Sequence, residues 1–192
     1  REAGALRPGM WSPPGMRKLV PALLLAACSV AAAGAAEPRP ASWLGQKLDP
    51  AQTPFCRAYG CEFQGVRHNT QNTMGWHDGT QRTYRLRSGA RLQVDLRPAG
   101  WISNAFLLFP PQPVAGGLHA LAPEHHAPAA EFLSAVTGRR FSAGAVAACQ
   151  RARLALNTPD AYGPTRPLSR WRTPGGLPFV ARCGINSQVG VW

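Results

Sequence analysis

Apolar and charged residues alternate along residues 84–97, and this alternation constrains the fold more than any other feature of the 192-residue chain. On either side of a short break, every second residue is apolar: Tyr84, Leu86, Leu92, Val94 and Leu96. A period of two is typical of a β-strand with one face in a hydrophobic core and the other in solvent. The break at residues 88–90 therefore predicts a hairpin with strands over 81–87 and 91–97.

The parity of this hairpin follows from the requirement that Leu86 and Leu92 share the buried face. A shift of one residue would turn one strand over, so the loop must contain an odd number of residues. The simplest such loop covers 88–90. It places Arg87 directly opposite Arg91, and like charges in that position destabilise a hairpin.

The other periodic segments are short. Alternation or apolar runs bounded by Pro and Gly predict strands over 61–68, 102–109, 177–183 and 187–192. Helical patterns predict helices over 127–136, stopped by Gly138, and over 143–156, with Ser142 as N-cap. Residues 69–80, 110–123 and 157–176 are rich in Pro, Gly or polar residues and are predicted as loops.

Strands and helices that are segregated along the chain favour an α+β fold over an alternating parallel α/β fold. We predict an antiparallel sheet of four to six strands with two helices on its apolar face. The length fits one such domain with appendages. A collagen-like chain is excluded because there is no Gly-X-Y period, and a multi-span membrane protein because only one segment is long and apolar.

That apolar segment predicts export. Arg17 and Lys18 follow Met16, and no charge occurs from Leu19 to Ala36. A basic head, an apolar stretch and small residues are typical of a secretory signal peptide. We expect a signal peptide over 16–36 and an upstream extension over 1–15. The alternative is a transmembrane helix, for which the stretch is slightly short.

The same segment can also be interpreted as the signal peptide of a lipid-anchored protein. Leu25-Ala26-Ala27-Cys28 resembles the lipobox of bacterial lipoproteins, which implies lipidation of Cys28. Soluble export and anchoring to the membrane through this lipid both remain open. Residues 37–55 follow as a Pro-rich linker, with Trp43 and Leu44 as a small anchor, before a single domain over 56–192.

Four cysteines remain after Cys28, and an even number in an exported chain predicts a disulfide framework. Of the three possible pairings we favour Cys56–Cys61 with Cys149–Cys183, because the first pair encloses a short loop and the second ties a helix to a strand. The alternatives are zinc binding and redox chemistry. Both are disfavoured because no C-x-x-C motif occurs.

The chain is strongly basic, with a formal net charge of +12. Four arginines of the predicted hairpin project from its solvent face beside Gln93: Arg85, Arg87, Arg91 and Arg97. The planar guanidinium fork suits carboxylate or phosphate, so these residues are candidates for binding an anionic polymer or protein of the envelope. An exported protein is not expected to meet nucleic acid. The alternative is an ordinary solvated sheet face.

Two tryptophans, Trp76 and Trp171, lie in predicted loops and are further binding candidates, since aromatic residues are common at interfaces. Alternatively, they cover the edge of the core.

Candidate catalytic and metal-binding residues are few. His77 and Asp78 form a candidate general base with its orienting carboxylate, although adjacent strand residues point to opposite faces. Three histidines accompany Glu124 as a conceivable metal site: His119, His125 and His126. No familiar catalytic motif occurs, and we expect no catalytic residue, metal or cofactor. The sequence favours an exported, non-catalytic binding or accessory protein of the bacterial envelope; the alternative is a small secreted hydrolase.

Overall fold

The computed structural model describes residues 42–69, 79–114, 118–155, 167–172, 178–183 and 187–191. All of them belong to one unit of the chain, Glu37–Trp192. The predicted extension, the predicted signal peptide with Cys28, and the residues Trp76, His77 and Asp78 lie outside the described residues. Within the described ranges, no helix is long and apolar enough to span a membrane.

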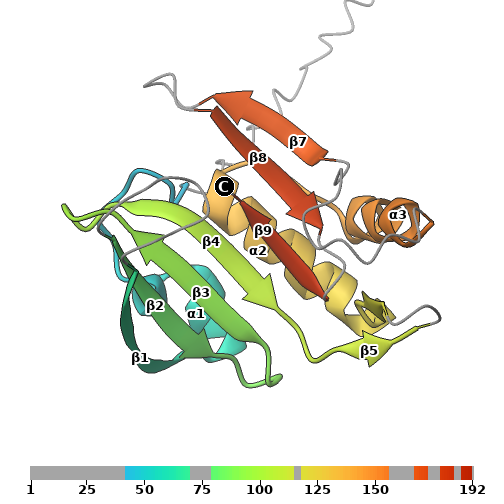
Figure 1. The fold of residues 1–192 in the computed structure, drawn as a ribbon, viewed down its shortest axis with the longest axis horizontal. Coiled ribbons are helices and arrows are strands. Elements are labelled where there is room, and N and C mark those ends of the chain that lie inside the picture. Colours follow the sequence, from blue (N-terminus) through green and yellow to red (C-terminus); the bar gives the residue numbers. More distant parts are fainter. Residues whose placement is uncertain are drawn as a thin grey trace, which may run out of the picture. The chain divides into compact units, whose positions relative to one another are not determined.

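The described chain forms a seven-stranded antiparallel sheet in the order β1-β2-β3-β4-β9-β8-β7, shown in Figure 1. Its strands are β1 (Glu62–Asn69), β2 (Gly79–Arg85), β3 (Arg91–Leu96), β4 (Ile102–Leu108), β7 (Pro167–Arg172), β8 (Pro178–Cys183) and β9 (Gln188–Val191). The chain leaves the sheet after β4 and returns at the far edge, so that β9 closes the sheet against β4. This confirms the α+β class, with seven strands rather than four to six.

Strand β7 is the strand of this sheet that was not predicted from the sequence. Residues 157–176 were predicted to be a loop because of their prolines, and this was wrong for Pro167–Arg172. An edge strand accepts Pro at its first residue, since one side of its backbone has no partner strand to bond. Trp171 consequently lies in a strand, as the Cα partner of Phe179, and not in a loop.

Within the described residues, three α-helices accompany the sheet: α1 (Pro54–Tyr59), α2 (His126–Thr137) and α3 (Ala143–Leu154). Helices α2 and α3 confirm the two predicted helices. The Ser142 hydroxyl accepts from the Ala145 N–H at 3.1 Å, and Gly138 ends α2 in the left-handed conformation. A two-stranded ribbon of β5 (Gln112–Pro113) and β6 (His119–Ala120), and two 3-10 helices, η1 (Pro50–Gln52) and η3 (Pro123–His125), complete the described elements. The predicted loop over 110–123 was therefore wrong for the four residues of this ribbon.

The loop of the β2–β3 hairpin has an odd number of residues, as predicted, but lies at a different position. Leu86 N–H donates to the Ala90 carbonyl at 2.8 Å, and Gly89 N–H donates to the Leu86 carbonyl at 2.8 Å. The three-residue loop is therefore 87–89, with Gly89 at a φ of 83° in its last position. Leu86 and Leu92 are both buried, as predicted. The predicted loop over 88–90 and the pairing of Arg87 with Arg91 are wrong, because Arg85 is the residue that lies opposite Arg91.

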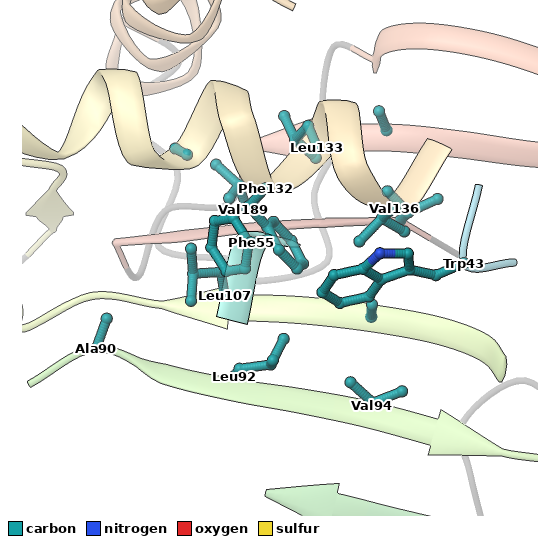
Figure 2. Close-up of a cluster of buried hydrophobic side chains, with 14 of the residues drawn as sticks. Trp43, Phe55, Ala90, Leu92, Val94, Leu107, Phe132, Leu133, Val136 and Val189 are labelled. Carbon is teal, nitrogen blue, oxygen red and sulfur yellow. The ribbon is translucent and has the colours of Figure 1, made fainter. Parts of the chain in front are cut away.

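The hydrophobic core lies between one face of the sheet and the helices. Figure 2 shows Leu92, Val94 and Leu107 of the sheet pointing toward Phe132 and Val136 of α2. All five side chains are inaccessible to solvent. We call this side of the sheet the inner face.

Residues 42–55, predicted as a linker, contribute directly to this core. Trp43 and Phe55 are almost completely buried. The Trp43 ring lies 6.1 Å from the Phe55 ring and 6.1 Å from the Phe132 ring, between the sheet and α2 (Figure 2). The segment is also bound by its backbone, since Trp43 N–H donates to the Val136 carbonyl at 3.0 Å. The predicted anchor is thus a central part of the packing.

Two disulfides connect the elements, and they confirm the favoured pairing. Cys56–Cys61 closes the turn after α1, and Cys149–Cys183 joins α3 to β8. Disulfides persist where the surroundings are oxidising, so the two bonds indicate an oxidising location outside the cytosol.

Candidate binding face

The side of the sheet opposite the core is formed by residues that are Cα partners on neighbouring strands. Successive Cα partners run from Thr83 through Gln93, Phe106 and Gly190 to Arg182. Directly paired residues of an antiparallel sheet share a face, so these five residues lie on one surface, which we call the outer face. The described helices pack on the inner side, to which they contribute Phe55, Phe132 and the Cys149–Cys183 bond.

The structure brings together two of the four predicted arginines, Arg85 and Arg91. They are direct Cα partners on the outer face, and both side chains are exposed. Glu62 of β1 is the Cα partner of Arg85 on its other side. In the described part of the chain, neither guanidinium has a hydrogen bond or an ion pair within 4 Å. The pair is therefore a concentration of positive charge on an open surface.

The other two arginines lie elsewhere. Arg87 lies in the hairpin turn, where its N–H donates to the Tyr59 carbonyl at 3.1 Å. Its guanidinium lies so close to Gly60 that a Cβ there would meet Nη2 at 3.1 Å. Arg97 lies in the turn at the opposite end of β3, six residues and therefore about 20 Å from Arg91.

Three further arginines of the outer face were not among the candidates. Arg67 of β1 is the Cα partner of Gln81, Arg170 of β7 is the partner of Val180, and Arg182 of β8 is the partner of Gly190. Burial and the nearby charge of Arg170 lower the pKa of the Arg182 guanidinium below its ordinary value. Positive charge thus occurs at both ends of the face. Only the cross-strand register could reveal this, because the three arginines come from strands that are far apart in the sequence.

One of the acidic residues of the outer face, Asp95, is held within the sheet by side-chain hydrogen bonds. Its Oδ1 accepts from Gln81 Nε2 at 2.9 Å and its Oδ2 from Asn104 Nδ2 at 3.5 Å. Burial raises the pKa of the Asp95 carboxyl, although both hydrogen bonds and the charge of Arg67 act in the opposite direction. Asp95 lies four residues, about 13 Å, along the strand from Arg91. This exceeds the screening length of roughly 8 Å at physiological salt, so their attraction is largely screened. Asp95 therefore does not neutralise the Arg85–Arg91 pair.

The candidate metal-binding histidines have other surroundings. The His125 ring stacks on Phe109 with centroids 4.6 Å apart, and His119 lies in the β5–β6 ribbon. Burial and the charge of Arg151 lower the pKa of His126. Among the residues that the structure describes, no three His, Cys, Asp or Glu side chains form a group suited to a metal ion.

Comparisons of the chain with models of protein families, with curated proteins and with solved structures found no match.

Proposed function

We propose that this protein is an exported, non-catalytic binding module of the bacterial cell envelope, and that its outer face holds an anionic partner. The partner is an envelope polymer or protein that presents carboxylate or phosphate groups. Nucleic acid is not its partner. The two disulfides support a location outside the cytosol. The segment 16–36 directs export in this proposal, and Cys28 is either removed with that segment or lipidated.

The observation that carries this proposal is the Arg85–Arg91 pair on the uncovered face. Like charges directly opposite one another destabilise a pair of strands. Asp95 lies too far away to relieve this repulsion. Glu62 lies opposite Arg85 but not opposite Arg91, so it offsets the charge of only one of the two arginines. An anion that bridges both guanidinium groups removes the repulsion and gains charge-assisted hydrogen bonds.

Binding of this kind requires several arginines at once. A single exposed ion pair contributes only about 0–1 kcal/mol. The outer face also carries Arg67, Arg170 and Arg182, so a polymer that crosses the sheet meets repeated positive charge. The affinity should then fall steeply as salt rises, because the screening length shortens from about 10 Å at 0.1 M to about 3 Å at 1 M.

The test replaces both members of the pair, Arg85→Ser with Arg91→Ser, and measures elution from a dextran sulfate column in a salt gradient. A control of equal charge is Arg57→Ser with Arg151→Ser, two exposed arginines on α1 and α3. We expect the strand variant to elute at clearly lower salt than the control variant and to unfold at a higher denaturant concentration than the unchanged protein. Equal elution of the two variants would mean that net charge alone decides binding.

A further inference from the structure

The two edges of the sheet differ. The edge strand β7 begins with Pro167 and carries the exposed Arg170, and both features discourage pairing with another strand. At the opposite edge, β1 presents two large apolar side chains to solvent, Phe63 at 53% and Val66 at 52% exposure. In the described chain, β1 has a partner strand on one side only.

A β-bulge in β1 gives this edge an unusual pattern. Phe63 pairs with Tyr84 and Val66 with Arg82, with a shift of register between residues 63 and 65. Phe63 and Val66 therefore share the inner face although they are three residues apart, which an unbulged strand does not permit. By the same shift, Glu62 and Arg67 share the outer face.

The backbone N–H and C=O groups of Phe63 and Val66 point away from β2, toward the open edge of the sheet. Leu86 N–H donates to the Ala90 carbonyl, so the backbone N–H and C=O groups of Leu86 point toward β3. Every second residue of β2 before Leu86, such as Tyr84 and Arg82, points its backbone groups the same way. Thr83 and Arg85 therefore bond toward β1, to the residues opposite them, Gly65 and Glu62. Phe63 and Val66 alternate with these, so their N–H and C=O groups face the open edge.

We propose that β1 pairs antiparallel with β1 of a second copy of this chain, across a two-fold axis between residues 64 and 65. Phe63 of each copy then lies opposite Val66 of the other and exchanges backbone hydrogen bonds with it. Glu62 lies opposite Arg67 on the other face. A two-fold contact needs a surface that is complementary to itself, and here apolar meets apolar and acid meets base at the same register.

This pairing goes beyond the proposed function and has a consequence for it. Because outer residues pair with outer residues, the outer faces of both copies form one continuous surface. The two Arg85–Arg91 pairs then lie on the same side of one sheet, where a long polymer can reach both and bind more tightly than to one copy.

The test is a charge exchange, with the mass in solution measured by light scattering. We expect a dimer for the unchanged protein. Glu62→Arg alone or Arg67→Glu alone should halve the mass, since each places like charges opposite one another. A mixture of the two variants should recover the dimer, because the new arginine at position 62 of one variant meets the new glutamate at position 67 of the other. Damage to the fold of either variant would not be reversed by mixing.

The control is Arg170→Glu at the other edge of the sheet, which should leave the dimer mass unchanged, and circular dichroism verifies that each variant is folded. A protein that stays monomeric at its highest soluble concentration overturns the proposal and leaves β1 to an extended segment of another protein. A dimer that survives both single reversals, or a mixture that stays monomeric, overturns it as well.

Discussion

Replacing Trp43 with alanine is expected to lower the free energy of unfolding by about 3–5 kcal/mol. The indole is 3% exposed and lies against Phe55 and Phe132. Its removal leaves a cavity between the sheet and α2, where neighbouring side chains cannot close the space completely. Denaturant titration followed by circular dichroism measures the change.

The matched control for this substitution is Trp101→Ala, because Trp101 is 48% exposed and its ring has Lys47 Nζ at 5.9 Å. Its loss should change the free energy of unfolding by no more than about 1 kcal/mol. If both alanine variants lose the same small amount, residues 42–55 are a peripheral linker after all and the description of the core is wrong.

Removing the Cys149–Cys183 disulfide by a double substitution with alanine should lower the free energy of unfolding by about 4 kcal/mol. The bond joins residues 34 apart in the sequence, so its absence gives the unfolded chain much more freedom. It also releases α3 from β8 on the inner side of the sheet. Chemical denaturation under oxidising conditions gives the value.

The shorter bond is the internal comparison. Cys56 and Cys61 are only 5 residues apart, and their double alanine variant should lose about 2 kcal/mol in the same loop-entropy treatment. A larger loss from the short bridge than from the long one would contradict this account of how the disulfides stabilise the domain.

The sequence predicted the elements whose periodicity is set by the core. The parity of the β2–β3 hairpin was correct because Leu86 and Leu92 must both be buried. The position of its loop was wrong by one residue, although the sequence contained the decisive signal: Gly89 suits the left-handed last position of a three-residue loop, whereas Ala90 does not.

The elements that were missed are short and flanked by proline. Helix α1 begins after Thr53, whose hydroxyl accepts from Cys56 N–H at 3.2 Å, with Pro54 in the first turn. Thr followed by Pro is a helix start signal, but six residues are too few to show a helical period. Strand β7 was missed because it begins with Pro167 and lies within a segment rich in Pro and Gly.

The candidate site was predictable only in part. Local alternation was enough to place Arg85 and Arg91 on a solvent face. Local alternation could not show that three other arginines share this face, because Arg67, Arg170 and Arg182 come from strands far apart in the sequence. The order of strands in the sheet, which brings them to one face, depends on long-range pairing that periodicity does not encode.

The most direct measurement of the proposed function is an NMR titration that follows the arginine side-chain Nε–Hε signals while polyphosphate is added. If the outer face binds anions, the signals of Arg85, Arg91, Arg170 and Arg182 shift together and saturate, while those of Arg57 and Arg151 on the helices stay near their starting positions. Shifts of similar size at all arginines, or the largest shifts at Arg57 and Arg151, would contradict the assignment of the binding surface to the outer face.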